Sequence, residues 1–426
     1  MVGEQYFEMR QGKKFEYSIL RYLCGTGRLG SPNWAKEVDW EINVDVTGRC
    51  LLILSNQNFT EAFNLLDYEE NLLVFKGYSQ DDLWLTSCNK LRISHIETNL
   101  ELGEPLDIVT GIPQQIIINR IDSPLEITDI KGFINNFKFL GLETSQYGRC
   151  YVRDKFTINV QNRNIVFRQL KKHKEILELI ETKQVSNAVL STMKFPVIES
   201  IEDSRKLVND ICYFLCFVNI NSNYCPVIYY LHDEEPVKIE IGDTITSPFH
   251  GNIVIDNHHI FGGLQQIFNG CFEQFQKLDE EINMKLFISN LLGMYEGKYL
   301  ENKIANLLLS YEYLMTKLLI ARNNILTQQQ VANLNFQQKL ARVNGLLRFI
   351  PRALLGDTLR TDVRNPLFHQ GEIPFLDFNS KLTVFTEYFD LLMQIVFILI
   401  GYSGDYISRI DYKVRQVPRS DYSSRG

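Results

Sequence analysis

The sequence predicts an α+β fold, with a β-rich N-terminal domain followed by an all-α helical bundle at the C-terminus. In the first half, short runs alternate apolar and polar residues with the period of two that is typical of strands. After about Phe261, apolar residues instead recur every three or four positions, as they do on one face of a helix. The length of 426 residues and the 45% hydrophobic content are enough for more than one packed core.

The strongest strand signal covers residues 38–46, where apolar side chains occupy the even positions and Asp, Glu and Asn the odd ones. Gly, Asn, Asp and Pro turns separate the other short apolar runs. Further strands are expected at residues 51–54, 71–75, 83–86, 115–119, 156–160 and 165–167. Together they predict an antiparallel sandwich or barrel-like domain over residues 1–170, which we interpret as a sensor or regulatory domain.

Residues 171–278 mix the two patterns and form either a second subdomain or an elaboration of the first. Helices are expected at 172–182 and 202–218, and strands at 226–231 and 237–241. Residues 279–404 are predicted to be a helical domain, and residues 405–426 a basic and aromatic tail. The helix expected over 382–401 is apolar on all sides after Leu391, so its own bundle or a second copy of the chain must cover it.

Composition restricts the function. The net charge of −7 argues against a protein that coats nucleic acid indiscriminately. The eight Cys include no C-x-x-C pair, so we predict reduced thiols, no metal and no cofactor, with Cys212 and Cys216 on one buried helix face. The apolar run 391–400 is too short for a membrane span, and the N-terminus resembles no secretion signal, so we expect a cytoplasmic protein without membrane contact.

The segment Gly25-Thr26-Gly27-Arg28-Leu29-Gly30 matches the G-x-G-x-x-G pattern of dinucleotide-binding turns. Such a turn must open a long helix inside a βαβ unit, but Ser31-Pro32-Asn33 disfavours helix immediately afterwards. We therefore predict a flexible glycine loop there. The chain also lacks a G-x-x-x-x-G-K-S/T phosphate loop.

The most informative motif is Arg364-Asn365-Pro366-Leu367-Phe368-His369. An Arg can hold a phosphate through two hydrogen bonds, and a His can exchange a proton with a ribose 2′-hydroxyl near neutral pH. These two groups suffice for RNA cleavage without a metal. The pair Arg168 and His173 has the same spacing, but it adjoins a Lys-rich helix start, which is most simply a solvated surface.

Three features favour the pair of Arg364 and His369. Asn365-Pro366 is a helix-start signature that would place Arg364 just outside a helix N-terminus, and Gly371 would end that helix soon after His369. A stretch with six basic and two acidic residues leads into the motif and would suit a phosphate backbone, although a solvated helix face explains it equally well. The basic residues are Lys339, Arg342, Arg348, Arg352, Arg360 and Arg364.

This arrangement resembles the HEPN superfamily, whose hallmark is Arg-x4-6-His, often with a polar residue after the Arg, and Asn365 fits that position. The run over residues 299–314 is similar to the corresponding helix of ApeA-type abortive-infection proteins, which also carry a β-rich N-terminal region. The resemblance covers about residues 280–402. It implies an anti-phage ribonuclease that acts as a homodimer through the C-terminal helical domain, with RNA as its substrate.

The resemblance also implies roles for individual residues. Arg364 would neutralise the scissile phosphate, and His369 would activate the 2′-hydroxyl or protonate the leaving 5′-oxygen, which gives a 2′,3′-cyclic phosphate. Asn365 would contact the substrate, or only cap the helix. Glu312 and Arg360 are supporting candidates, since Glu312 lies among apolar neighbours and could orient Arg364 or His369 or form a structural ion pair. Some HEPN toxins have a Tyr two residues after the His, whereas this chain has Gly371.

Alternatives remain open at this point. The chain could be a nuclease-inactive HEPN scaffold that binds nucleic acid, a nucleotide or a protein partner. The β-rich half could sense a phage-derived trigger or restrain the nuclease, and an inhibitory partner could act on it. The tail could stack bases and contact phosphate through its Arg and Tyr residues, or it could be a poorly ordered terminus or a pairing arm.

Overall fold

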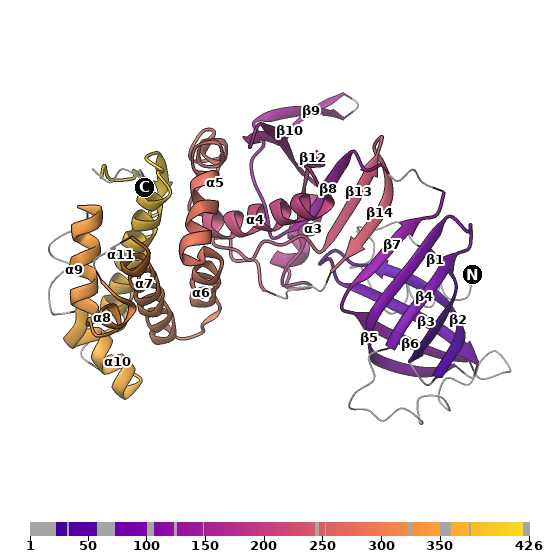
Figure 1. Cartoon of the computed structure of the whole chain (residues 1–426), viewed down its shortest axis with the longest axis horizontal. Helices are drawn as coiled ribbons and strands as arrows, with labels where there is room; N and C mark the ends of the chain where they lie inside the picture. Colours follow the sequence, from indigo (N-terminus) through magenta and orange to yellow (C-terminus); the bar gives the residue numbers. More distant parts are fainter. Residues whose placement is uncertain are drawn as a thin grey trace. The chain divides into compact units, whose positions relative to one another are not determined.

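A computed structural model of the chain describes residues 23–31, 34–57, 73–99, 106–122, 126–147, 149–242, 247–251, 253–322, 326–349, 359–374 and 376–420. The chain divides into two compact units that alternate along the sequence. The first unit comprises residues 1–138, 166–209 and 223–249, and the second comprises residues 139–165, 210–222 and 250–426. The first is rich in strands and the C-terminal half of the chain is helical (Figure 1).

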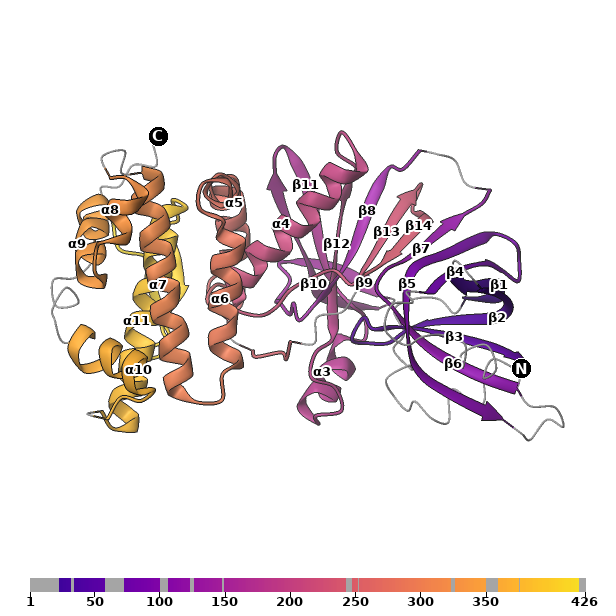
Figure 2. The same ribbon diagram turned by 60° about the horizontal axis from the view of Figure 1, so that its bottom comes forward.

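Among the described residues of the first unit, six strands close into an antiparallel barrel (Figure 2). Its order is β4-β1-β2-β3-β6-β5, and pairing between β4 and β5 completes the ring. The strands are β1 (Leu23–Ser31), β2 (Trp34–Val44), β3 (Cys50–Gln57), β4 (Leu73–Ser79), β5 (Trp84–Asn99) and β6 (Leu106–Pro113). The barrel alternative of the sequence prediction is therefore confirmed, and closure leaves these strands without a free edge.

The period-two alternation places large apolar side chains inside the barrel. Trp40 and Phe75 are buried there with their rings edge to face at 5.7 Å. The Trp40 indole N–H donates to the carbonyl oxygens of Thr26 at 3.1 Å and Tyr78 at 3.2 Å, so this buried donor is satisfied. The alternation predicted for residues 38–46 is thus confirmed over residues 38–44 of β2, where the even-numbered side chains are buried, and the strand ends at Val44.

The predicted glycine loop at residues 25–30 is wrong, because these residues form most of β1. The glycines face a neighbouring strand at very short range. A Cβ on Gly25 would lie 1.9 Å from the Tyr78 carbonyl oxygen, and one on Gly27 would lie 2.7 Å from the Gly77 Cα. Glycine is needed here for close contact between β1 and β4 and not for a turn.

The sheet of the first unit continues beyond the barrel, because the long strand β5 also pairs with β7. From β7 the order is β14-β13-β8-β12-β11, all antiparallel. These strands are β7 (Ile116–Arg120), β8 (Asp129–Asn135), β11 (Arg163–Gln169), β12 (Val189–Pro196), β13 (Val227–His232) and β14 (Glu235–Ile241). The predicted helix at 172–182 is confirmed as α3 (His173–Glu181), which packs on β12.

The second unit begins with the hairpin of β9 (Glu143–Tyr147) and β10 (Cys150–Val160). Helix α5 (Gly263–Ile282) packs on β10, and an Asn159 N–H donates to the Asn269 side chain at 2.8 Å. The second half of α4 (Ile201–Asn219) contributes Phe214, whose ring lies 4.8 Å from Phe268. Cys212 and Cys216 are both buried on α4, as predicted.

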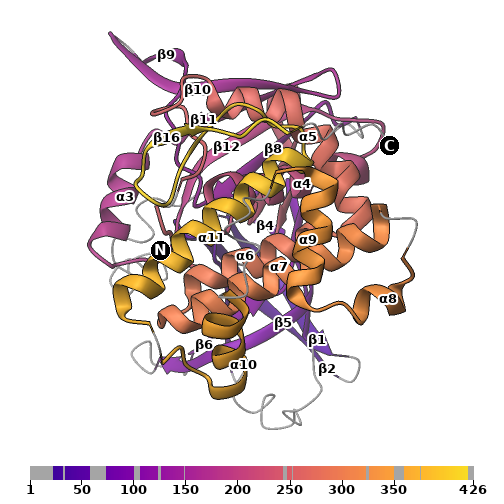
Figure 3. The ribbon, with the colours of Figure 1, turned by 90° about the vertical axis from the view of Figure 1, so that its left-hand side faces the viewer.

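The remaining helices centre on α7 (Leu300–Arg322), which contacts α6, α9 and α11 (Figure 3). The Tyr311 hydroxyl donates to the Tyr388 carbonyl oxygen at 2.6 Å and ties α7 to α11. The other helices are α6 (Met284–Glu296), α8 (Gln328–Ala332), α9 (Phe336–Leu347), α10 (Asn365–Gln370) and α11 (Phe378–Leu399). The prediction of a helical C-terminal half is confirmed.

In the described residues, α7 and α11 are long and apolar enough to cross a membrane by length and composition alone. Half of the apolar window of α7 and 67% of that of α11 are buried inside the protein. Core helices of soluble proteins meet the same two criteria, so the apolar character of α11 is accounted for by packing within the protein.

Residues 405–416 form a hairpin, with β15 (Asp405–Ile407) paired to β16 (Val414–Gln416). The buried Asp390 carboxylate of α11 accepts hydrogen bonds from the Tyr406 hydroxyl at 2.7 Å and from the Arg409 N–H at 2.9 Å. These contacts tie Tyr406 and Arg409 to α11, and the roles suggested for the tail stay predictions. Tyr422 and Arg425 lie outside the described residues.

Candidate active site

The Arg364 to His369 motif spans the junction of two helical segments. A π-helical turn, η3 (Leu359–Arg364), runs directly into α10. Arg364 has right-handed helical dihedral angles, φ −65° and ψ −51°, and so lies within continuous helical backbone. The prediction that Asn365 caps the helix and leaves Arg364 outside it is wrong.

Pro366 explains the wide turn. Inside a continuing helix, a proline lacks the N–H that would bond the carbonyl four residues earlier, and its ring presses against that carbonyl. For Pro366 this carbonyl belongs to Asp362, which lies inside η3. A π-helical turn provides the extra width, and such turns are frequent at functional sites. Gly371 ends α10 as predicted, with φ +79° and its N–H bonded to the Leu367 carbonyl oxygen at 3.0 Å.

Arg364 faces the helices that surround α10. Its guanidinium carbon lies 5.8 Å from the centre of the Phe336 ring of α9 and 5.4 Å from that of Phe368. The nearest carboxylate oxygen, on Glu312 of α7, is 3.8 Å from Nη2, which is an ion pair but too long for a hydrogen bond. The guanidinium therefore has cation–π contacts with both rings, while the pair with Glu312 uses none of its N–H donors.

A second cation neutralises Glu312. The Lys339 ammonium of α9 donates to Glu312 Oε1 at 3.0 Å, and the Lys339 side chain is only 7% exposed. Two cations therefore share one carboxylate, which leaves a local excess of one positive charge at the Arg364 side chain. The structure brings Glu312 to Arg364, and it removes Lys339 from the basic surface that the sequence predicted.

His369 lies in the last turn of α10 and its side chain is exposed. Five residues of helix turn the backbone by about 140° beyond a full turn, so Arg364 and His369 point to different sides of α10. The residue stacked on Arg364 is instead Phe368, four positions along the helix. Sequence reasoning missed Phe368 and Phe336, although the i, i+4 spacing of Arg364 and Phe368 was a usable signal.

The other predicted site residues make few contacts among the described residues. Asn365 is half-buried and, within the described residues, its side chain makes no hydrogen bond. Arg360 lies in η3 one turn before Arg364, but its side chain, like all of Arg352, is outside the described residues. In the competing pair, His173 starts α3 and its Nδ1 is 2.8 Å from the Leu170 carbonyl oxygen, while Arg168 is exposed on β11.

Comparison with known proteins adds little to this geometry. No family model matches the chain. In an alignment of 82 residues that covers 17% of the chain, it is 34% identical to the UvrABC system protein C of Mycoplasma capricolum subsp. capricolum. The chain spans only 14% of that protein, so the similarity is local and does not show the family.

Proposed function

We propose that the chain is a metal-independent endoribonuclease of the HEPN type, an anti-phage abortive-infection effector that acts as a homodimer. The observation that carries the proposal is the set of contacts that the Arg364 guanidinium makes. Its guanidinium contacts two aromatic rings and its N–H donors are not taken by Glu312, and the same continuous helical segment carries the exposed His369 in its last turn. A phosphate is the anion that such a planar donor set binds best.

The proposed chemistry follows from these two groups. Arg364 binds the scissile phosphate and offsets the charge that develops on its oxygens. The ribose 2′-oxygen attacks phosphorus, the bond to the 5′-oxygen breaks, and the products are a 2′,3′-cyclic phosphate and a 5′-hydroxyl. His369 takes the proton of the 2′-hydroxyl or supplies one to the leaving oxygen. Because His369 points away from Arg364 on one helix, a second copy brings the complementary imidazole to the same phosphate.

The test uses the second Arg/His pair as a matched control. Arg364→Ala and His369→Ala should each lower cleavage of a labelled single-stranded RNA by about 10² to 10⁴-fold, the usual contribution of acid–base catalysis. Arg168→Ala and His173→Ala should leave it unchanged. Cleavage should persist in EDTA and leave cyclic phosphate ends. Arg364→Lys should cleave RNA little better than Arg364→Ala, because an ammonium lacks the planar set of N–H donors of a guanidinium. Undiminished cleavage by His369→Ala would remove the assignment.

A second function is favoured because the side chains of Arg364 and His369 point to different sides of α10. A HEPN scaffold without nuclease activity would need only the phosphate-binding Arg364 and would bind nucleic acid, a nucleotide or a protein partner. It predicts RNA binding that Arg364→Ala weakens, with no turnover by the parent protein. Cyclic phosphate products formed by the parent and lost in His369→Ala would exclude it.

A further inference from the structure

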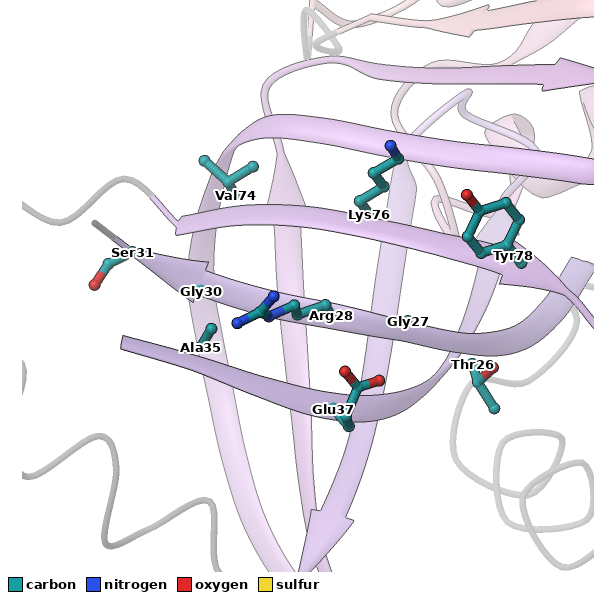
Figure 4. Close-up of a pocket in the computed structure, with 10 residues that line it drawn as sticks. All are labelled: Thr26, Gly27, Arg28, Gly30, Ser31, Ala35, Glu37, Val74, Lys76 and Tyr78. Carbon is teal, nitrogen blue, oxygen red and sulfur yellow. The ribbon is translucent and has the colours of Figure 1, made fainter. Parts of the chain in front are cut away.

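The outer surface of the barrel carries a groove that the proposed nuclease does not use. It lies over β1, with β2 on one side and β4 on the other, and has a cavity volume of about 670 Å³ (Figure 4). Strand alternation points its side chains outward, away from the buried Trp40 and Phe75. The side chains Arg28, Glu37, Lys76 and Tyr78 supply its chemistry.

The strand register arranges these side chains in rows across the groove. Gly30 pairs with Ala35 of β2 and Val74 of β4, so this row has small side chains or none and forms a hollow end. Two residues along β1, Arg28 pairs with Glu37 and Lys76. The hollow end therefore adjoins a charged row. In Figure 4 the Arg28 guanidinium extends along β1 toward Gly30, and the Lys76 side chain points away from β1.

The charged row places two positively charged side chains next to each other. Arg28 and Lys76 are direct cross-strand neighbours, and like charges in this position destabilise a sheet. Both side chains are exposed, and in the described part of the chain neither forms an ion pair or a hydrogen bond. Glu37 offers one carboxylate on the far side of Arg28. An anion between Arg28 and Lys76 would turn this repulsion into two favourable contacts.

The third row adds an aromatic surface. Thr26 pairs with Tyr78, whose side chain is 46% exposed at the edge of the groove. Tyr78 lies two residues from Lys76 on β4, a separation of about 6.7 Å along a strand. This is comparable to the distance between the phosphate of a nucleotide and its base. Aromatic side chains beside cations are the usual means by which small β-barrels hold single bases.

We propose that this groove binds a nucleotide, with its phosphate between Arg28 and Lys76 and its base stacked on Tyr78. The ribose lies between these two rows, and in a single strand the neighbouring nucleotide extends over the hollow end at Gly30. A free mononucleotide and one residue of a single-stranded nucleic acid present the same chemistry. The site does not depend on the Arg364 and His369 motif, since it lies wholly in the first unit.

The experiment uses the full chain and two probes. AMP binding is measured by calorimetry, and binding of a labelled oligodeoxyadenylate of about ten nucleotides, a typical barrel site size, is measured by fluorescence anisotropy. The oligodeoxyadenylate lacks the 2′-hydroxyl, so the proposed ribonuclease chemistry cannot cleave it, and the result stands whether or not the nuclease proposal holds. AMP binding identifies a free nucleotide, whereas binding of the oligonucleotide alone identifies a single strand.

Arg28→Ala and Lys76→Ala should each lower the affinity for whichever probe binds by at least about tenfold, which is the loss expected for a hydrogen bond to a charged group. Tyr78→Ala should weaken it at least about fivefold through lost stacking. Glu37→Gln should bind at least as tightly as the parent, because a competing carboxylate charge is removed. Arg92→Ala is the matched control, since Arg92 is an exposed Arg on β5 outside the groove.

Three results would overturn the proposal. The first is that neither probe binds. The second is that Arg28→Ala and Lys76→Ala bind as the parent does. The third is that Arg92→Ala weakens binding as much as Arg28→Ala, which would reduce the interaction to general attraction by surface charge. Circular dichroism shows whether each variant keeps the parent fold. Weaker probe binding by variants with the parent spectrum supports the proposed site.

Discussion

The cluster of Glu312, Lys339 and Arg364 predicts an asymmetric response to mutation. Lys339 is the buried partner, with a side chain 7% exposed, whereas Glu312 is 30% exposed. Removing Glu312 leaves a buried ammonium without its carboxylate, while removing Lys339 leaves a carboxylate that water reaches and that Arg364 still faces at 3.8 Å. Glu312→Leu should therefore cost much more stability than Lys339→Met.

The magnitudes follow from the burial of each partner. Breaking a buried ion pair by deleting one partner costs about 3–5 kcal/mol, and the partial exposure of Glu312 lowers our expectation for Glu312→Leu to about 2–3 kcal/mol. Met matches the Lys339 stem in length, so Lys339→Met should change the free energy of unfolding by less than about 1 kcal/mol. The double variant removes both charges and should recover most of the loss from Glu312→Leu.

Urea unfolding can follow the two units with separate signals. All three Trp, at positions 34, 40 and 84, lie in the first unit, so tryptophan fluorescence reports on the barrel. Far-UV circular dichroism is dominated by the helices. Glu312→Leu should shift the circular dichroism transition, whereas Lys339→Met should shift it little. Neither variant should move the fluorescence transition, which makes the barrel an internal control.

Equal costs for Glu312→Leu and Lys339→Met, or a double variant no more stable than Glu312→Leu, would refute the reasoning. Either result would show that the Lys339 ammonium finds other partners or that the pair does not govern this region. RNA cleavage gives an independent measure for the same variants. Lys339→Met leaves the full Glu312 charge to Arg364, so cleavage should fall although stability is kept.

Three further predictions concern the barrel and the helical packing. Gly25→Ala should destabilise the barrel by about 3 kcal/mol, because its Cβ would lie 1.9 Å from a backbone oxygen, and tryptophan fluorescence in urea should show it. Gly270→Ala in α5, where the Cβ meets nothing within 4 Å, should instead be neutral or stabilising. Lys381 hydrogen-bonds Glu301 at 2.7 Å and lowers the pKa of that carboxyl, so the pair stabilises the fold above about pH 4.5 and loses this effect as pH falls through the lowered pKa. The stability difference between the parent and Glu301→Gln, measured across this range, should shrink as pH falls, and a difference independent of pH would contradict the assignment.

The hydrophobic pattern of a segment predicted its structure where that structure depends only on the segment's own residues and not on the strands packed against it. The alternation over residues 38–44 requires one buried face wherever the strand lies, so β2 was predictable from the sequence. The strand β1 was not, because its glycines are selected by contact with β4, about 50 residues later in the chain. Glycine has no strand preference of its own, and the same composition is usual in loops.

The candidate site shows the same limit. Asn365-Pro366 is a valid helix start by itself, but a helix can also pass through Pro366 when a π-helical turn widens the backbone, as η3 does. The pairing of Glu312 with Lys339 joins residues 27 positions apart, and only the packing of α7 against α9 brings them together. Residue spacing therefore located the motif, but it could not show which side chains surround Arg364.

The spacing of Arg364 and His369 has a structural consequence for any function proposed for them. An i, i+4 pair would share one face of α10, and that position is taken by Phe368, which stacks on Arg364. The i, i+5 spacing turns His369 out to solvent while Arg364 stays between α7 and α9. A ribonuclease of this design must complete its site with the surface of another copy, whereas a binding scaffold needs Arg364 alone. Oligomeric state and cleavage should therefore change together in the first case and independently in the second.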